Sequence, residues 1–247
     1  MKTKTFAALI ALELLTGCQD LSKSVFPENN SEAMSVLLDK TDEMSKPKSD
    51  DILKLYNISD DKKYDGFLLR CRPISDVSLE PVEQFQVKPE TWINADDVER
   101  VQEIKEFQTS FSQWYVGANK PINKPKTHSV IYRTLADEAN RMADLKTVKV
   151  RKILVCSDLA EHSNDLDLYN PRDIQLVQNK PQLVIDRFEK LVPIKSLKGI
   201  TVYFVFHPQN YNQQQQYDIA SKFFKMLLEE KGAVVIVGAN VLAEDEH

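Results

Sequence analysis

Two aspartates in this 247-residue chain occupy positions where a buried strand is expected to end. Asp39 follows the apolar or small residues 34–38, and Asp158 follows the apolar run 153–156 with one serine between. In an open α/β sheet, ligands bind outside the carboxyl ends of the strands, so two carboxylates there can meet at one edge. Like charges repel at close range, and a hard divalent cation such as Mg²⁺, which prefers oxygen ligands, offsets that repulsion. In the simpler alternative, each aspartate only caps the helix or turn that follows it.

Hydroxyl groups near these aspartates could complete an all-oxygen metal site. Thr41 lies two residues after Asp39, and either Thr127 or Ser129 supplies a hydroxyl just before a segment expected to form a long helix. Magnesium accepts hydroxyl and water oxygens beside carboxylates, so these residue types suit it. The remaining residues expected at the rim of this edge are Asp42, Glu43, Thr127 and His207.

The elements that must position these residues alternate along the chain. Apolar runs predict strands at 34–38, 66–71 (ended by Pro73), 82–87 (an edge strand), 153–156, 200–206 and 234–237. Helices are predicted at 50–56, 98–114, 130–145, from about Pro181 onward and at 214–231. The helix at 98–114 is expected to bury the stripe Val98, Val101, Ile104, Phe107, Phe111 and Trp114. Strands that alternate with helices predict an α/β fold with three layers, in which helices cover both faces of a mostly parallel central sheet.

Composition excludes several other classes of protein. The formal net charge of −5 leaves no basic stripe for nucleic acid. Six glycines are too few and too scattered to form a Gly-rich loop for a nucleotide phosphate. Cys71 and Cys156 lack the paired spacing of a zinc site, and both lie in apolar runs, where a cysteine usually serves as a small buried side chain.

Two segments resemble the metal-binding motifs of von Willebrand factor A-like domains. Residues 36–42 (VLLDKTD) look like the first strand and metal loop of that family, and residues 153–159 (ILVCSDL) are similar to the later strand that carries its third-motif aspartate. A looser similarity extends over about residues 35–242. Domains of this family hold Mg²⁺ at a metal-ion-dependent adhesion site, where a carboxylate of the partner protein completes the coordination.

The resemblance implies a role for each candidate ligand. Asp39 and Thr41 would belong to the first motif, Ser129 or Thr127 to the middle one, and Asp158 to the last. The family's first motif is Asp-x-Ser-x-Ser, and Glu43 departs from it because a carboxylate cannot copy a neutral hydroxyl.

The same resemblance implies a strand order. It places the strand of Asp39 between the strand at 66–71 and the strand at 153–156. Cys71 and Cys156 would then lie about two strand spacings apart, roughly 10 Å. A disulfide needs Cα atoms within about 7 Å, so we predict that these cysteines are not bonded to each other.

The N-terminus resembles the export signal of a bacterial lipoprotein. Lys2 and Lys4 precede the short apolar run 6–12, and Leu15-Thr16-Gly17-Cys18 is similar to the lipobox, whose cysteine is lipidated and becomes the first residue of the mature chain. Glu13 departs from the pattern because it places a carboxylate within the apolar region. The alternative is an ordinary N-terminal helix in which Cys18 has no special role.

These patterns divide the chain into four parts. We expect a signal peptide at 1–17, a lipidated N-terminus and tether at 18–33, a von Willebrand factor A-like domain at 34–242 and a tail at 243–247. The lipid on Cys18 would then hold the domain on a bacterial membrane, in a periplasmic or surface-exposed position.

The expected function is binding of a protein partner by this domain, through Mg²⁺ at the strand-end residues, without catalysis. One alternative is a hydrolase that uses the carboxylates of Asp39 and Asp158, although the chain lacks the Gly-x-Ser-x-Gly motif of a serine hydrolase. Another is a metal-free structural component of an envelope or conjugation apparatus.

Overall fold

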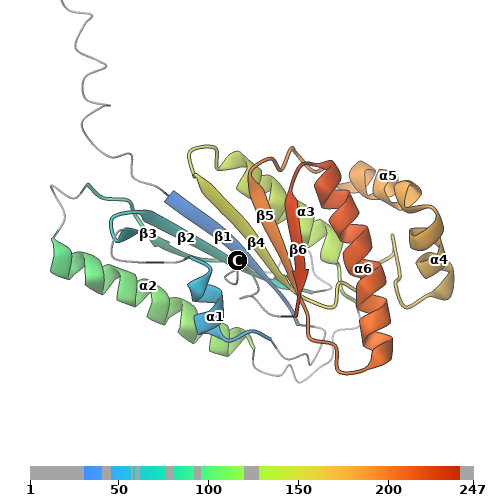
Figure 1. Ribbon diagram of the computed structural model, residues 1–247, viewed down its shortest axis with the longest axis horizontal. Coiled ribbons are helices and arrows are strands. Elements are labelled where there is room, and N and C mark those ends of the chain that lie inside the picture. Colours follow the sequence, from blue (N-terminus) through green and yellow to red (C-terminus); the bar gives the residue numbers. More distant parts are fainter. Residues whose placement is uncertain are drawn as a thin grey trace, which may run out of the picture.

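A mostly parallel sheet forms the centre of the protein in the computed structural model (Figure 1). The structure describes residues 31–40, 46–56, 58, 62–75, 81–91, 96–119 and 128–239. Within these ranges the strand order is β3-β2-β1-β4-β5-β6, and only the edge strand β3 is antiparallel to its neighbour. The strands are β1 (Ser31–Asp39), β2 (Gly66–Ile74), β3 (Glu83–Val87), β4 (Val150–Cys156), β5 (Ile200–Val205) and β6 (Val234–Gly238).

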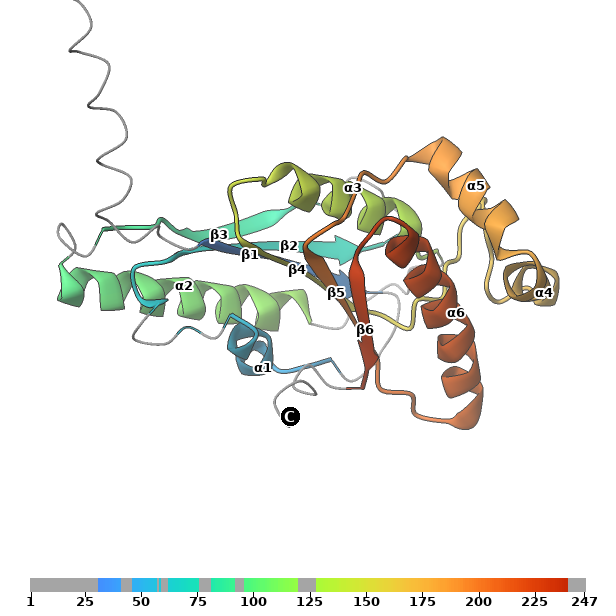
Figure 2. The ribbon, with the colours of Figure 1, turned by 45° about the horizontal axis from the view of Figure 1, so that its top comes forward.

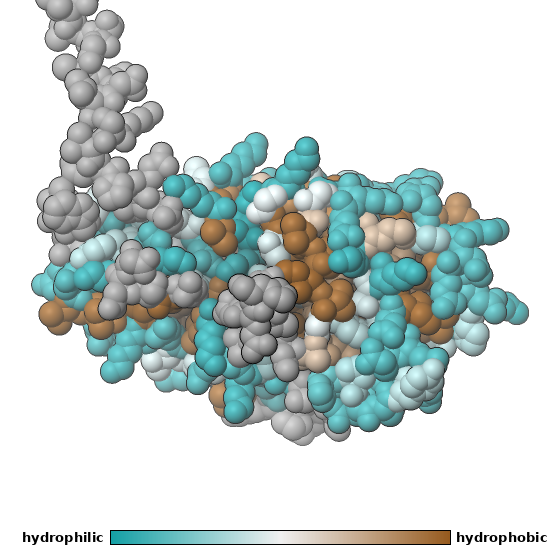
Figure 3. Space-filling view, viewed as in Figure 1, coloured by the Kyte–Doolittle hydropathy of each residue, from teal (hydrophilic) through white to brown (hydrophobic). Residues whose placement is uncertain are grey.

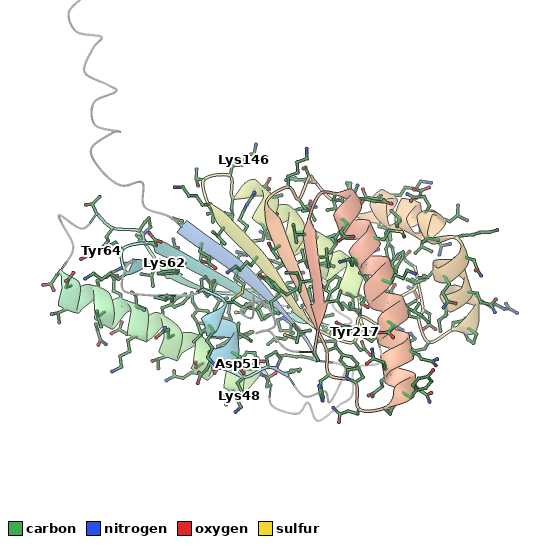
Figure 4. The ribbon with its side chains drawn as sticks, in the orientation of Figure 1. Lys48, Asp51, Lys62, Tyr64, Lys146 and Tyr217 are labelled. Atoms are coloured by element: carbon green, nitrogen blue, oxygen red, sulfur yellow. The ribbon has the colours of Figure 1, made fainter. Side chains whose placement is uncertain are left out.

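Helices cover both faces of this sheet, which confirms the three-layer α/β fold. One face carries α1 (Ser49–Lys54) and α2 (Asp97–Ala118), and the other carries α3 (Ile131–Asp144), α4 (Pro171–Asn179), α5 (Pro181–Leu191) and α6 (Tyr211–Glu230). Figure 2 shows α3 and α2 on opposite sides of the strands. Besides apolar packing, hydrogen bonds join the helices to the sheet. The hydroxyl of Tyr217 in α6, labelled in Figure 4, donates to the Phe204 carbonyl of β5 at 3.1 Å.

The central strand β1 is buried from Glu32 to Asp39, which explains why its sequence is almost uninterrupted in apolar and small residues. Successive side chains point to opposite faces. Met34, Val36 and Leu38 therefore join the core beneath α1 and α2, and Ala33 and Leu37 join the core beneath α3. The side chain of Asp39 points to the same face as Ala33 and Leu37.

The predicted order of the three central strands is confirmed. β1 pairs with β2 on one side and with β4 on the other, so it lies between Cys71 and Cys156. Cys71 is opposite Val36, and Cys156 is opposite Leu38. Both thiols are buried and free, and burial raises the pKa of Cys156 to about 12.

Several predicted boundaries differ from the structure by a few residues. β2 does not end at Pro73 but runs to Ile74. The Ile74 carbonyl accepts from the amide of Lys40, toward β1, so the nitrogen of Pro73 faces the other side of the strand. The pairing of β3 with β2 has already ended at Cys71, and a residue without an N–H is tolerated there. Helix α4 was not expected, although Asn170 caps it and Pro171 begins it.

The predicted inner face of α2 is wrong in its first two turns. Val98 is 80% exposed and Val101 is 58% exposed, whereas Arg100 is buried with Phe107, Phe111 and Tyr115. The guanidinium of Arg100 donates to three main-chain carbonyls, those of Lys63 (2.6 Å), Lys88 (2.8 Å) and Asp65 (2.5 Å). These bonds turn the arginine toward the sheet, so the two valines face outward.

No helix among the described residues is both long and apolar enough to cross a lipid bilayer.

Candidate functional site

The carboxylate of Asp39 lies fully buried at the carboxyl end of β1, between two serine hydroxyls. Ser157 Oγ donates to Asp39 Oδ2 at 2.6 Å, and Ser129 Oγ donates to the same oxygen at 3.2 Å. Ser157 directly follows β4, and Ser129 lies two residues before α3. Because β1 and β4 are parallel neighbours, their ends bring Asp39 and Ser157 together, and the start of α3 adds Ser129 from the face that Asp39 points to.

A tight turn follows β4 and involves both Ser157 and Asp158. Ser157 Oγ accepts from the amide of Leu159 at 2.9 Å, and Asp158 Oδ1 accepts from the amide of Ala160 at 2.9 Å. Leu159 has a φ of +59°, the left-handed region that glycine prefers. The side chain of Leu159 is fully buried in the core beside α3, and this burial offsets the backbone strain.

A short antiparallel bridge holds Ser129 in place. The amide of Ser129 donates to the His162 carbonyl at 3.2 Å, and the amide of His162 donates to the Ser129 carbonyl at 2.9 Å. The ring of His162 stacks on that of His128, with centroids 4.8 Å apart, and its Nδ1 lies 3.0 Å from Asp167 Oδ1. The loop after β4 therefore supports the segment before α3 through main-chain and ring contacts.

Glu161 supplies the start of α3 with a cap from this same loop. The residue before the helix, Val130, makes no side-chain capping bond, and Glu161 Oε2 accepts from the amide of Tyr132 at 2.8 Å. Burial raises the pKa of Glu161 to about 7, although hydrogen bonds from Ser163 and from the amides at the start of α3 oppose that rise. A buried carboxyl group whose pKa is raised toward neutral pH thus lies near the strand-end residues.

The structure brings together some of the predicted site residues. Asp39 and Ser129 are in direct contact. Asp158 is at the same end of the sheet, but Ser157, which was not among the predicted ligands, makes the hydrogen bond to Asp39. His207 is exposed after β5, and its carbonyl accepts from the side chain of Gln209. The other candidates lie outside the described residues: Cys18, Thr41, Asp42, Glu43 and Thr127.

Sequence reasoning placed Ser157 at this end of the sheet but not among the site residues, and it missed Glu161 altogether. The sequence did indicate a role for Ser157, because this residue stands between a predicted strand and a candidate ligand. The sequence held almost no indication for Glu161, because its hydrogen-bond partner in α3 is 29 residues earlier in the chain. The only hint was that Val130, just before the helix, cannot serve as a side-chain cap.

The donors around Asp39 are carboxylate and hydroxyl oxygens, the ligand types that a hard cation prefers. The carboxylate of Asp39 already accepts two hydroxyl hydrogens, an arrangement that orients the serine oxygens and neutralises part of its charge. Within the described ranges, no three side chains of the types His, Cys, Asp and Glu are grouped so that they could hold a metal ion. A cation here would therefore depend on serine and threonine hydroxyls and water besides Asp39 and Asp158. These residues fit Mg²⁺ in kind, since every candidate donor is an oxygen atom.

No known family model matches this chain, and neither does any curated protein sequence. Among solved structures, an aerotolerance-related membrane protein from Bacteroides fragilis, in a form with multiple mutations to serine, shares 10% identity with a TM-score of 0.38. That match covers 86% of this chain and 94% of the other. The human COPII-coat protein Sec24c shares 9% identity with a TM-score of 0.39. That match covers 86% of this chain and 30% of the Sec24c chain.

Proposed function

We propose that this protein is an extracytoplasmic lipoprotein whose α/β domain binds a protein partner at the carboxyl ends of its strands. The observation that carries this proposal is the environment of Asp39. A fully buried carboxylate at the end of the central strand, held by hydroxyls from two distant segments, is costly to assemble. The arrangement resembles the site at which von Willebrand factor A-like domains bind their partners.

A magnesium ion is the second part of the proposal. Asp39, Ser129 and Asp158, with Thr41 as a further hydroxyl, would hold it. When bound, the cation supplies a localised positive charge that attracts a carboxylate of the partner. Ser157 would keep Asp39 oriented, because its hydroxyl donates to Asp39 and accepts from the turn after β4.

A serine hydrolase with Ser157 as its nucleophile receives less support from the same geometry. Ser157 is fully buried, and its hydroxyl is already committed to Asp39 as donor and to the Leu159 amide as acceptor. A nucleophile must reach the substrate, and this serine faces the interior instead.

Calorimetric titration with magnesium tests the metal part of the proposal. The protein without residues 1–18 is compared with its Asp39→Ala and Asp158→Asn variants, and with Asp186→Asn on the exposed surface of α5 as a control. We expect binding in the starting protein and in the control, and at least a tenfold weaker affinity in the other two. Absence of binding in the starting protein would refute the metal part.

The partner part is tested separately by cross-linking on intact cells. A photoreactive residue in place of His207, which is exposed at the same end of the sheet, should link the protein to a specific partner. The same residue placed at Gln182, on the exposed surface of α5, serves as the control. Equal cross-linking at both positions would contradict a partner-binding surface at the strand ends.

A further inference from the structure

A groove lies at the side of the molecule, between α6 and the corner where α4 meets α5. Its volume is about 400 Å³, and Figure 3 shows hydrophobic surface between α6 and α4. The lining residues come from the end of α4, the first residue of α5 and one stripe of α6: Val177, Gln178, Pro181, Asp218, Ile219, Lys222, Phe223 and Met226. This place is distinct from the strand ends, so the inference does not depend on the proposed function.

The groove follows from the way the two short helices are joined. Lys180 is the only residue between them. It is both the C-cap of α4 and the N-cap of α5. Its φ of −141° and ψ of 54° are not helical, and Pro181 then starts a new helix in another direction. The chain therefore turns away from α6 at this corner, and no side chain of the described residues fills the space that the turn leaves open.

The interior of the groove is apolar. Val177 and Phe223, which are 4% and 2% exposed, form its floor. Pro181, Ile219 and Met226 are only partly buried and form its walls. Pockets that bind small molecules have this size and character, with a few polar groups that orient the ligand. A methionine in the wall can also adjust to the shape of an apolar chain.

The charges at the rim are arranged asymmetrically. Asp218 and Lys222 lie one helical turn apart on α6, and Asp218 Oδ1 accepts from the side chain of Gln214 at 2.6 Å. Within the described part of the chain, Lys222 has no hydrogen bond or ion pair, and its side chain is exposed beside the apolar floor. The groove thus offers an unengaged cation next to apolar surface, whereas its carboxylate already has a donor.

We infer that this groove binds a small amphipathic acid, an aliphatic chain that carries one carboxylate, such as a medium-chain fatty acid. The chain lies over Val177 and Phe223, and the carboxylate pairs with Lys222 Nζ at the rim. Charge complementarity selects an acid over an amine, because the only rim cation without a partner among the described residues is Lys222. The volume of about 400 Å³ accommodates a chain of this size.

Calorimetry with octanoate, decanoate and the neutral analogue 1-octanol tests this inference. Longer chains should bind more tightly, by up to about fourfold per methylene group, which corresponds to about 0.8 kcal/mol. Lys222→Gln should weaken octanoate binding about tenfold and leave 1-octanol unchanged. Asp218→Asn should strengthen octanoate binding, because it removes a like charge from the rim. Lys190→Gln, an exposed lysine of α5 outside the groove, is the matched control and should change nothing.

A second variant tests the place of binding. Ile219→Trp should fill the groove and abolish binding of all three probes, while circular dichroism reports whether the fold is kept. Undiminished octanoate binding in a folded Ile219→Trp protein would overturn the inference. Equal octanoate affinity of Lys222→Gln and Lys190→Gln would also overturn it. A concentration-dependent dimer that Ile219→Trp abolishes would instead assign the groove to a second copy of the chain.

Discussion

At the scale of single residues, the loop after β4 carries most of what is unusual in this protein. Residues 157–162 hold Asp39, cap α3 and support Ser129, and they do so with a left-handed leucine and a buried carboxyl group. Strained or titrating groups are costly to keep in a fold and often accompany functional sites. Two measurable consequences follow from Glu161 and from Leu159.

Glu161 should make stability depend on pH. Burial raises its folded-state pKa from 4.5 to about 7, so between these values the folded protein keeps a proton that the unfolded chain has lost. The free energy of unfolding therefore falls as pH rises through this window, by about 3 kcal/mol in total. Glu161→Gln cannot titrate and can still accept from the Tyr132 amide, so this part of the pH dependence should disappear.

Urea denaturation of both proteins between pH 5 and pH 8 measures this effect. Glu106→Gln, at an exposed position of α2 on the other face of the sheet, should retain the slope of the unmodified protein. If the free energy of unfolding of Glu161→Gln fell with pH as steeply as that of the unmodified protein, another group would be responsible for the pH dependence.

At position 159, the glycine variant should be more stable than the alanine variant, which is the reverse of the usual order. Replacing a fully buried leucine by either residue removes apolar contacts and costs about 2–5 kcal/mol. At a φ of +59°, however, glycine avoids a backbone penalty of about 1 kcal/mol that alanine retains. Leu159→Gly should therefore unfold at a higher urea concentration than Leu159→Ala.

Leu166 provides the matched control for this comparison. It is 1% exposed in the same region, and its φ is not positive. There the alanine variant should be the more stable of the two, because glycine has the larger conformational entropy in the unfolded chain. The same order at both positions would contradict the strain assigned to Leu159.

At the scale of the elements, α2 shows how one polar side chain can set the orientation of a helix. Arg100 connects α2 to the loop at residues 62–65 and to the end of β3 through three carbonyl groups. It also pairs with Glu103 at 2.9 Å, but Glu103 is largely exposed. The main-chain bonds are therefore expected to dominate its contribution.

Arg100→Met should lower the free energy of unfolding by about 3 kcal/mol, because it leaves these carbonyls without their donor. Chemical denaturation measures the loss. Glu103→Gln removes only the exposed ion pair and should cost less than about 1 kcal/mol. Equal costs for the two variants would mean that the ion pair, and not the main-chain contacts, holds the helix.

At the scale of the whole molecule, the proposed lipid anchor can be tested independently of the described domain. The described residues begin at Ser31 in β1, and Cys18 lies outside them. If lipid on Cys18 is the attachment, Cys18→Ser should move the protein from the membrane fraction to the soluble fraction and leave its fold intact. Cys71→Ala, which changes a buried cysteine of β2, should leave the protein membrane-bound. A Cys18→Ser protein that stays on the membrane with an unprocessed N-terminus would refute the anchor.

Much of the fold could be predicted, and part of the candidate site. Runs such as 34–38 and 200–206 indicated strands because burial on both faces leaves a continuous apolar sequence. The position of Asp39 at the end of β1 followed from the same run. The contact of Asp39 with Ser157 could not be derived from local periodicity, because it depends on the register in which β1 and β4 pair.

The sequence alone determined the succession of strands and helices and the placement of Asp39 and Asp158 at strand ends, because periodicity and strand burial are local properties of a segment. Only the tertiary structure decided that Ser157 holds Asp39, that Glu161 caps α3 and that Arg100 displaces two valines from the inner face of α2. Each of these outcomes depends on a polar group that must find a partner far away in the sequence once it is buried. The energy of such a pair belongs to the packed molecule, and no window of neighbouring residues contains it.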